Sequence, residues 1–247
     1  MSKQRALFLL IAATFTAGSA QAALIYSQGF ESGSLAGSGF TLVPSAANNL
    51  WHVTSNFPKS GSKALGFVQN ETAGGSPNGD YDVSPSSAVG RVVGPSISLS
   101  GYQAAGLTLS FEAYLNNDVI DWGDDQYDRL TMWISTDGGS TWGTNPVASS
   151  YSLDTASVFI PANTPGYNLV TVDLSAWVGQ SITLGFDFND YDPAYNDYDG
   201  ARVDNILIQG TASGGGGGGG GPTVPEPATL ALLGLGLLGL GAMRRKR

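Results

Sequence analysis

The chain of 247 residues contains no cysteine and only one histidine, His52. Without cysteine there is no disulfide, thiolate zinc site, iron–sulfur cluster or cysteine nucleophile. A single histidine cannot build a three-histidine zinc site. His52 also follows Trp51, a residue expected in the core, which argues against a catalytic triad. A domain of this size can be stable through its core alone, without disulfides.

Basic residues are scarce too, with 11 Lys and Arg against 20 Asp and Glu. Between Ala23 and Ala212 the only bases are Lys59, Lys63, Arg91, Arg129 and Arg202, whereas every acidic residue except Glu226 lies in that span. Such a domain repels nucleic acid and anionic lipid and attracts cations. We therefore expect no nucleic acid among its partners.

The first 22 residues have the pattern of a secretory signal peptide. A basic start, Lys3 and Arg5, precedes an apolar run over residues 6–17 and the small-residue motif Ala-Gln-Ala. We predict cleavage between Ala22 and Ala23 and export across the inner membrane. The alternative, an uncleaved anchor, is disfavoured because the apolar run is short and ends in a cleavage motif.

The other end of the chain reads as a membrane-sorting tail. A glycine-rich linker (residues 213–223) leads to the motif Val224, Pro225, Glu226 and Pro227. An uncharged stretch over residues 228–243 follows, and four basic residues end the chain. We predict a short transmembrane helix with its basic end in the cytoplasm and the domain outside.

This tail resembles the PEP-CTERM sorting signal of Gram-negative bacteria, in its Pro-Glu-Pro box, its short Leu/Gly helix and its basic end. The resemblance covers residues 224–247. It implies recognition by an exosortase, cleavage near the box, and association with exopolysaccharide and biofilm at the cell surface or in the extracellular matrix.

Residues 23–212 read as one all-β domain. Apolar and polar residues alternate over residues 107–115, 130–135 and 182–188, with shorter runs at 170–174 and 203–208. Weaker candidate strands cover residues 24–30, 51–54, 64–68 and 92–99. Gly, Pro, Asn, Asp and Ser clusters separate these segments, and no helical stripe or repeat is present. We predict about nine or ten strands in an antiparallel β-sandwich of the jelly-roll type.

The order of short motifs in this domain resembles the MAM-like jelly rolls, in particular the cleaved-adhesin and choice-of-anchor modules of bacterial surface proteins. The motifs include Phe30-Glu31, residues 60–65 (Ser-Gly-Ser-Lys-Ala-Leu), residues 135–142 (Ser-Thr-Asp-Gly-Gly-Ser-Thr-Trp) and Val203-Asp204-Asn205-Ile206. The resemblance implies an adhesive or ligand-binding module, often stabilised by calcium. It places Glu31 and Asp204 together at a metal site, because the first and last strands of a jelly roll are neighbours. A hydrogen-bonded turn or bulge is the alternative role for Asp204.

Two acidic loops are further candidates for calcium, which binds six to eight oxygen ligands. One spans residues 118–128 and the other residues 190–199, and the candidate ligands are Asp128, Asp190, Asp192 and Asp199. The alternative is that these loops are only acidic and solvated.

The same loops carry aromatic residues, whose rings can stack on sugars. The candidate ligand-binding residues are Trp122, Tyr127, Tyr191, Tyr195 and Tyr198. Ordinary loop packing is the alternative. Residues 135–142 match the Asp-box, Ser-x-Asp-x-Gly-x-Thr-Trp, which we interpret as a folding element.

Together these features predict an exported, non-enzymatic binding or adhesion module that contacts exopolysaccharide. Two alternatives remain open. One is a glycan-cleaving enzyme that uses loop Asp carboxylates, although exposed carboxylates lack the burial that raises the pKa of a general acid. The other is a structural matrix protein without a specific ligand.

Overall fold

A computed structural model describes residues 22–43, 48–118, 128–191 and 193–213. The predicted signal peptide up to residue 21 and the predicted linker and tail from residue 214 lie outside this part of the chain. Trp122, Tyr127, Asp192 and the motif Val224 to Pro227 lie outside it as well.

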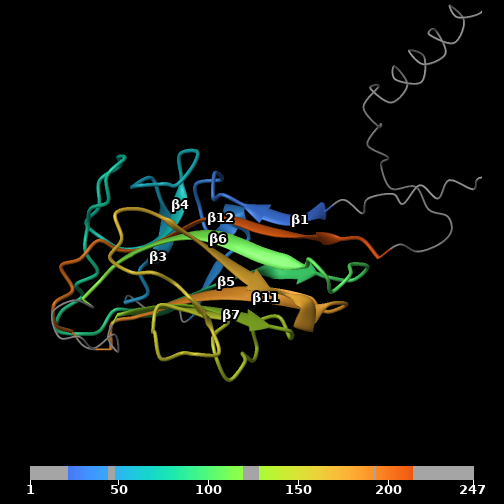
Figure 1. The fold of residues 1–247 in the computed structure, drawn as a ribbon. Helices are drawn as coiled ribbons and strands as arrows, with labels where there is room; N and C mark the ends of the chain where they lie inside the picture. The colour runs from blue at the N-terminus through green and yellow to red at the C-terminus, as the bar shows by residue number, and fades with distance from the viewer. Residues whose placement is uncertain (1–21, 44–47, 119–127, 192, 214–247) are drawn as a thin grey trace, which may run out of the picture. The chain divides into compact units, whose positions relative to one another are not determined.

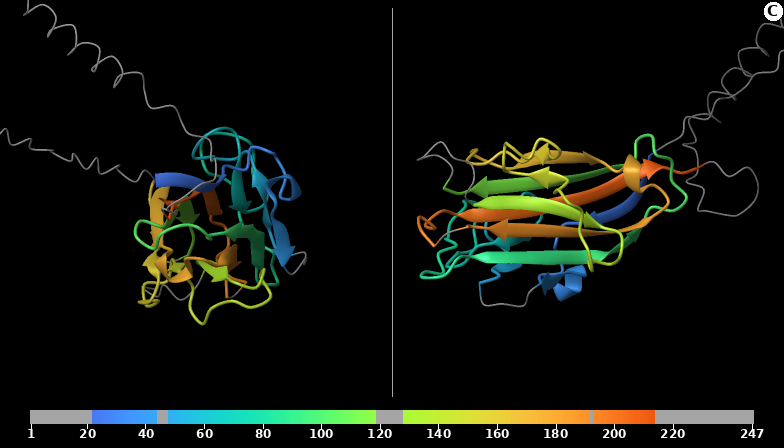
Figure 2. Two further views of the ribbon diagram at one scale, coloured as in Figure 1. Left: turned by 90° about the vertical axis from the view of Figure 1, so that its right-hand side faces the viewer. Right: turned by 90° about the horizontal axis from the view of Figure 1, so that it is seen from below.

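Two sheets form a β-sandwich, as predicted (Figure 1). Sheet A has the order β10 (Asn168–Asp173), β6 (Thr108–Asn116), β12 (Gly200–Thr211), β4 (Ala64–Phe67) and β3 (Trp51–Thr54), and β1 (Ala22–Gln28) also pairs with β12. Sheet B has the order β2 (Thr41–Val43), β5 (Val89–Ser98), β11 (Ser181–Asn189), β7 (Arg129–Ser135), β8 (Ala148–Ser149) and β9 (Val158–Phe159). All pairs are antiparallel except β8 with β9. Figure 2 shows the two layers from the end and sheet B from below.

The described residues form twelve strands, more than the nine or ten predicted. The additional ones are β2, β8 and β9, which have only two or three residues each and so cannot show alternation. Two 3-10 helices, η1 (Ala36–Ser38) and η2 (Ser175–Trp177), complete the secondary structure. Within the described ranges, no helix is long and apolar enough to cross a membrane.

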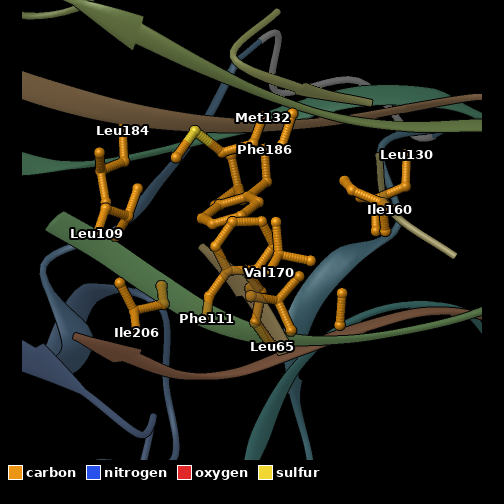
Figure 3. Close-up of a cluster of buried hydrophobic side chains, with 14 of the residues drawn as sticks. Leu65, Leu109, Phe111, Leu130, Met132, Ile160, Val170, Leu184, Phe186 and Ile206 are labelled. Carbon is orange, nitrogen blue, oxygen red and sulfur yellow. The ribbon is translucent and has the colours of Figure 1, made fainter. Parts of the chain in front are cut away.

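The core lies between the sheets and follows the predicted alternation. Leu109 and Phe111 point inward from β6, and Leu184 and Phe186 point inward from β11, all almost completely buried. Phe111 and Phe186 meet edge to face across the two sheets, with ring centroids 5.3 Å apart (Figure 3). Edge-to-face contact is a preferred geometry for aromatic pairs, so it helps to set how the sheets face each other.

A β-bulge in β12 explains why its apolar pattern changes phase. Val203 is buried, and so are Ile206 and Ile208, although Val203 and Ile206 are three residues apart. The pairing of β12 with β6 shifts register between Asp204 and Leu207, and Asn205 has a positive φ of 50°. The extra residue of a bulge restores the inward orientation beyond it.

The sandwich is complete within residues 22–213. Its core residues lie between Phe30 and Ile208, and the first and last strands pair from Ala22 with Thr211 to Gln28 with Ile206. A segment with its own core and closed strand pairing folds as an independent unit.

Candidate functional site

The outer face of sheet B gathers polar and aromatic side chains in register. Trp133 on β7 lies opposite Gly185 on β11, and the next position on this face pairs Thr131 with Asp187. Asp187 in turn lies opposite Arg91 on β5. Because side chains two residues apart share a face of a strand, these residues form rows across three neighbouring strands.

Arg91 and Asp187 form the centre of this face. The Arg91 guanidinium donates two parallel hydrogen bonds to the two carboxylate oxygens of Asp187, through Nε and Nη2. Its Cζ atom lies 4.3 Å from the ring centroid of Trp142 and 5.4 Å from that of Trp133. Burial raises the pKa of Asp187, and the hydrogen bond and charge of Arg91 act in the opposite direction. A bidentate pair held between aromatic rings is a rigid element of the surface.

Trp142 reaches this face because residues 135–142 fold back over the sheet. The Asp137 carboxylate accepts hydrogen bonds from the Thr141 amide at 2.9 Å and from the hydroxyls of Ser135 and Thr141, both at 2.7 Å. The Thr141 and Ser135 hydrogen bonds lower the pKa of Asp137 to about 2. A Cβ atom on Gly185 would lie 2.7 Å from the Trp142 ring, so glycine is needed for this packing. The interpretation of the Asp-box as a folding element agrees with these contacts.

Arg129 occupies the other end of β7, with its guanidinium beside two tyrosine rings. Its Cζ atom lies 3.6 Å from the Tyr151 ring centroid and 4.8 Å from that of Tyr191. Cation–π contacts of this kind stabilise the guanidinium.

A groove of about 290 Å³ lies on this face, floored by β7 and β11. Its lining consists of Arg129, Thr131, Trp133, Thr144, Asn145, Pro146, Asp154, Asp187, Asn189 and Tyr191. A second hollow, of about 250 Å³, extends toward β5 and β2 and shares Asp187 and Asn189 with the groove. The two hollows therefore adjoin across the strands, which suits an extended ligand.

The groove combines aromatic rings with hydrogen-bonding groups. The indole Nε1 of Trp133 donates to the Thr131 hydroxyl at 2.9 Å, which fixes the ring on the sheet. Asp154 accepts a hydrogen bond from Ser149 at 2.5 Å. Apolar rings beside a few fixed polar groups are typical of small-molecule and sugar sites.

Among the predicted ligand-binding residues in the described part, one lines this groove. Tyr191 lines it and is 52% exposed. Tyr195 is 64% exposed and does not line the groove. Tyr198 packs against the core, and its hydroxyl lies 3.4 Å from an Asp118 carboxylate oxygen. Trp122 and Tyr127 lie outside the described residues.

Sequence reasoning missed Trp133, Trp142, Tyr151, Arg91 and Arg129. The available signal was the strand pattern itself. Trp133 falls on the polar side of the alternation in residues 130–135, where a large aromatic residue faces solvent. A tryptophan at such a position is a better indicator of a binding face than an aromatic residue in a loop.

The predicted metal residues Glu31 and Asp204 lie at opposite ends of one loop, residues 59–63. Asp204 Oδ2 accepts hydrogen bonds from the amides of Lys59 and Ser60, both at 3.0 Å. Glu31 Oε1 accepts from the amides of Ser62 and Lys63, at 3.0 and 3.1 Å.

The two carboxylates differ in their surroundings. Asp204 is completely buried, and burial raises its pKa, to which the nearby charge of Glu31 adds. Hydrogen bonds from Ser62 lower the pKa of Glu31. Both carboxylates anchor the loop between β3 and β4, and Asp204 lies at the bulge.

Three other predicted calcium ligands hold loops together. Asp128 is buried and accepts a hydrogen bond from the Tyr81 hydroxyl at 2.7 Å. Asp190 is buried and accepts from the Ala88 amide at 2.5 Å, and Asp199 accepts from the Tyr114 hydroxyl at 3.0 Å.

Calcium at these residues stays a prediction, and Asp192 lies outside the described residues. Across the described ranges, no three His, Asp or Glu side chains group closely enough to hold a metal ion.

His52 is part of a network that runs from the surface to the buried Arg202. Its Nε2 lies 2.9 Å from Glu71, which is also 3.6 Å from Arg202, and its Nδ1 lies 2.8 Å from the Leu50 carbonyl.

Residues 223–247 match the family model of the PEP-CTERM protein-sorting motif. The chain carries this sorting motif at its C-terminus. The motif implies export, sorting at the membrane and processing by an exosortase. No curated protein matches the chain.

Among solved structures, the domain is similar to several carbohydrate-binding modules. One module, described by its specific mannan recognition, is 12% identical with a TM-score of 0.39, and the match covers 78% of this chain and all of that one. A xylan-binding domain from Paenibacillus barcinonensis is 12% identical with a TM-score of 0.38, over 80% of this chain and all of that one. A module of the β-sandwich superfamily, described by its promiscuous specificity, is 16% identical with a TM-score of 0.35, over 73% of this chain and 60% of that one. At these values the likeness is one of architecture alone.

Proposed function

We propose that this protein is an exported, non-enzymatic glycan-binding module whose ligand lies in the groove on the outer face of sheet B. The observation that carries the proposal is the groove itself, in which Trp133 and Tyr191 lie beside Thr131, Asn189 and Asp187. Aromatic faces stack on the apolar faces of sugar rings, while amides, hydroxyls and carboxylates bind sugar hydroxyls. A rigid sheet holds such groups in place and so limits the entropy lost on binding.

A binding measurement tests this proposal directly. Residues 22–213 are titrated by calorimetry with exopolysaccharide fragments from the source organism and with a panel of defined oligosaccharides. We expect saturable binding, and we expect Trp133→Ala to weaken it at least about tenfold, as truncation of a central aromatic anchor does.

The matched control is Leu169→Ala, which removes a 65% exposed apolar side chain from β10 in sheet A. It should bind like the unmodified domain, and the melting temperature of each variant reports whether it is folded. If every glycan fails to bind, or if both variants bind equally well, the groove is not the ligand site.

The two alternatives have their own readouts. A glycan-cleaving enzyme would release new reducing ends during incubation, and loop Asp→Asn changes would abolish that release. Two carboxylates across a cleft are required for such chemistry. In the groove Asp187 is engaged by Arg91 and Asp154 by Ser149. A structural matrix protein would show neither cleavage nor saturable binding.

We also propose that calcium binds at Glu31 and Asp204. Support comes from the burial of Asp204 beside a second carboxylate, with no basic side chain within 4.0 Å of either among the described residues. Two carboxylates fall short of six to eight ligands, so backbone carbonyls and water would have to complete the site. Calcium should raise the melting temperature of the unmodified domain and not that of Asp204→Asn. An unchanged melting temperature in the unmodified domain would refute the site.

The sorting tail supports a further part of the proposal, that an exosortase cuts near Pro225 to Pro227 and leaves the domain at the cell surface in contact with exopolysaccharide. Mass spectrometry of the protein recovered from native cell surfaces tests it. A mass that lacks the residues after the box supports processing, whereas a mass that includes Arg247 shows that the tail is retained.

A further inference from the structure

The few basic side chains of the domain are almost all paired. Arg91 binds Asp187, Lys59 lies 3.6 Å from Glu112, and Arg202 lies 3.6 Å from Glu71. Lys63 is near enough to Glu31 that its charge, together with the stronger effect of the Ser62 hydrogen bonds, lowers the pKa of that carboxyl. In a domain so rich in carboxylates, pairing of the bases is the expected outcome.

Arg129 is the exception. Among the described residues it forms no ion pair, and its Nε is buried without a hydrogen-bond partner. A buried guanidinium nitrogen without a partner loses hydration and gains no bond in return, which is costly. A ligand cannot reach this covered atom, but the two Nη atoms are not covered and form no hydrogen bond with a described residue, so they are the donors open to the groove.

The rings around Arg129 limit how it can be used. Tyr151 lies 3.6 Å from its Cζ and Tyr191 lies 4.8 Å from it. These rings cover the guanidinium, so the N–H edge is the part left to bind a ligand. A guanidinium edge presents a rigid fork of donors, and a carboxylate matches that fork with two oxygens in one plane.

The acidic groups that line the same groove do not pair with the Arg129 guanidinium. Asp187 is held by two hydrogen bonds from Arg91, and Asp154 accepts one from Ser149. Neither lies within 4.0 Å of the Arg129 guanidinium. Among the described residues, Arg129 is therefore the positive charge of the groove that has no ion-pair partner.

We infer that the groove takes an acidic glycan and that Arg129 binds the carboxylate of a uronic acid unit. This inference rests on the proposed glycan-binding function and names the class of its ligand. Trp133 and the polar groups of β7 and β11 contact the neighbouring sugar, while Arg129 selects the charged unit. The surplus of carboxylates on the domain opposes approach of an anionic chain, so recognition depends on this local contact and not on overall attraction.

The test compares matched ligands. Calorimetry on residues 22–213 uses oligogalacturonate and alginate oligosaccharides, each alongside its carboxyl-reduced neutral form. For the oligomer that binds, we expect the acidic form to bind about tenfold to a hundredfold more tightly than its reduced form, the range expected for charge-assisted hydrogen bonds. Arg129→Met should remove this difference, so that the acidic and reduced forms bind the variant with similar affinity. Arg129→Lys keeps the charge but not the fork, so it should recover only part of the preference.

The outcomes separate the two proposals. If acidic and reduced forms bind the unmodified domain equally and Trp133→Ala weakens both, glycan binding stands and the uronate inference falls. A sulfated galactan that binds as tightly as the uronates would replace carboxylate recognition with simple charge attraction and overturn the inference. If no glycan of any charge binds, the proposed function itself fails. Because the first comparison uses the unmodified domain, it remains decisive even if an Arg129 variant misfolds.

Discussion

Replacement of Gly185 by alanine is the sharpest test of how side chains pack on the outer face of sheet B beside the groove. The new Cβ would lie 2.7 and 2.8 Å from two atoms of the Trp142 ring and 3.3 Å from Arg91 Cδ. The closest of these are shorter than real Cβ contacts, so the indole must move. Away from such contacts, alanine in a strand is more stable than glycine by about 0.5–1 kcal/mol. Whether Gly185→Ala lowers or raises the free energy of unfolding therefore shows whether the Trp142 ring packs against this position.

We expect Gly185→Ala to lower the free energy of unfolding by about 1–3 kcal/mol, the usual cost of overpacking. In a domain of this length that corresponds to a drop in melting temperature of about 2–10 °C. The assay is urea unfolding of residues 22–213 followed by circular dichroism, which does not depend on the displaced tryptophan.

A double-mutant cycle with Trp142→Ala provides the control. Once the indole is absent, Gly185→Ala should be neutral or slightly stabilising, which gives a coupling energy of about 1–3 kcal/mol between the two sites. If Gly185→Ala is neutral or stabilising while Trp142 is present, the indole does not pack over β11 and the described packing of the face beside the groove is wrong.

Two further predictions concern buried carboxylates. Burial, with a contribution from the charge of Asp190, raises the pKa of Asp128 to about 7 in spite of the hydrogen bond from Tyr81. Because the folded state holds the Asp128 proton more tightly, protonation of Asp128 stabilises the fold. This contribution is fully present below the unfolded-state pKa of about 3.9 and is lost as the pH rises through about 7. The melting temperature of Asp128→Asn minus that of the unmodified domain should therefore increase from pH 4 to pH 8. A difference that stays constant over this range would contradict the raised pKa. Asp204→Ala leaves the amides of Lys59 and Ser60 without their acceptor, so it should cost about 2–4 kcal/mol in urea unfolding. A change below about 0.5 kcal/mol would mean that the loop does not depend on this carboxylate.

The strands that form the core could be predicted from the sequence because burial imposes a period of two. The alternation in residues 107–115 and 182–188 became β6 and β11, with the expected residues buried. The shortest strands could not be found this way, since β8 has only two residues and is defined by its pairing with β7. In the sequence, the bulge was visible only because Asp204 and Asn205 interrupt the apolar run over residues 203–208. Its position depends on the pairing of β12 with β6.

The groove was harder to predict than the fold. It depends on contacts between residues far apart in the chain, such as Arg91 and Asp187, which are 96 positions apart. Strand order and register bring such residues together, and neither is readable from local periodicity. Composition drew attention to aromatic residues in acidic loops, of which Tyr191 lines the groove and Tyr195 does not. The solvent-facing Trp133 on a strand was the stronger signal.

The pairing of β12 has a mechanical consequence. This strand leads directly to residue 213, and it is hydrogen-bonded to β6 along one side and to β1 and β4 along the other. A force that pulls on the C-terminal end of the domain acts along β12. It therefore shears the hydrogen bonds between β12 and its neighbours, and many of these bonds must break together before the strand can slide. The point where force would enter the domain is thus a central strand of sheet A, and a domain held by this end should withstand drag from the surrounding medium without unravelling from its attachment point.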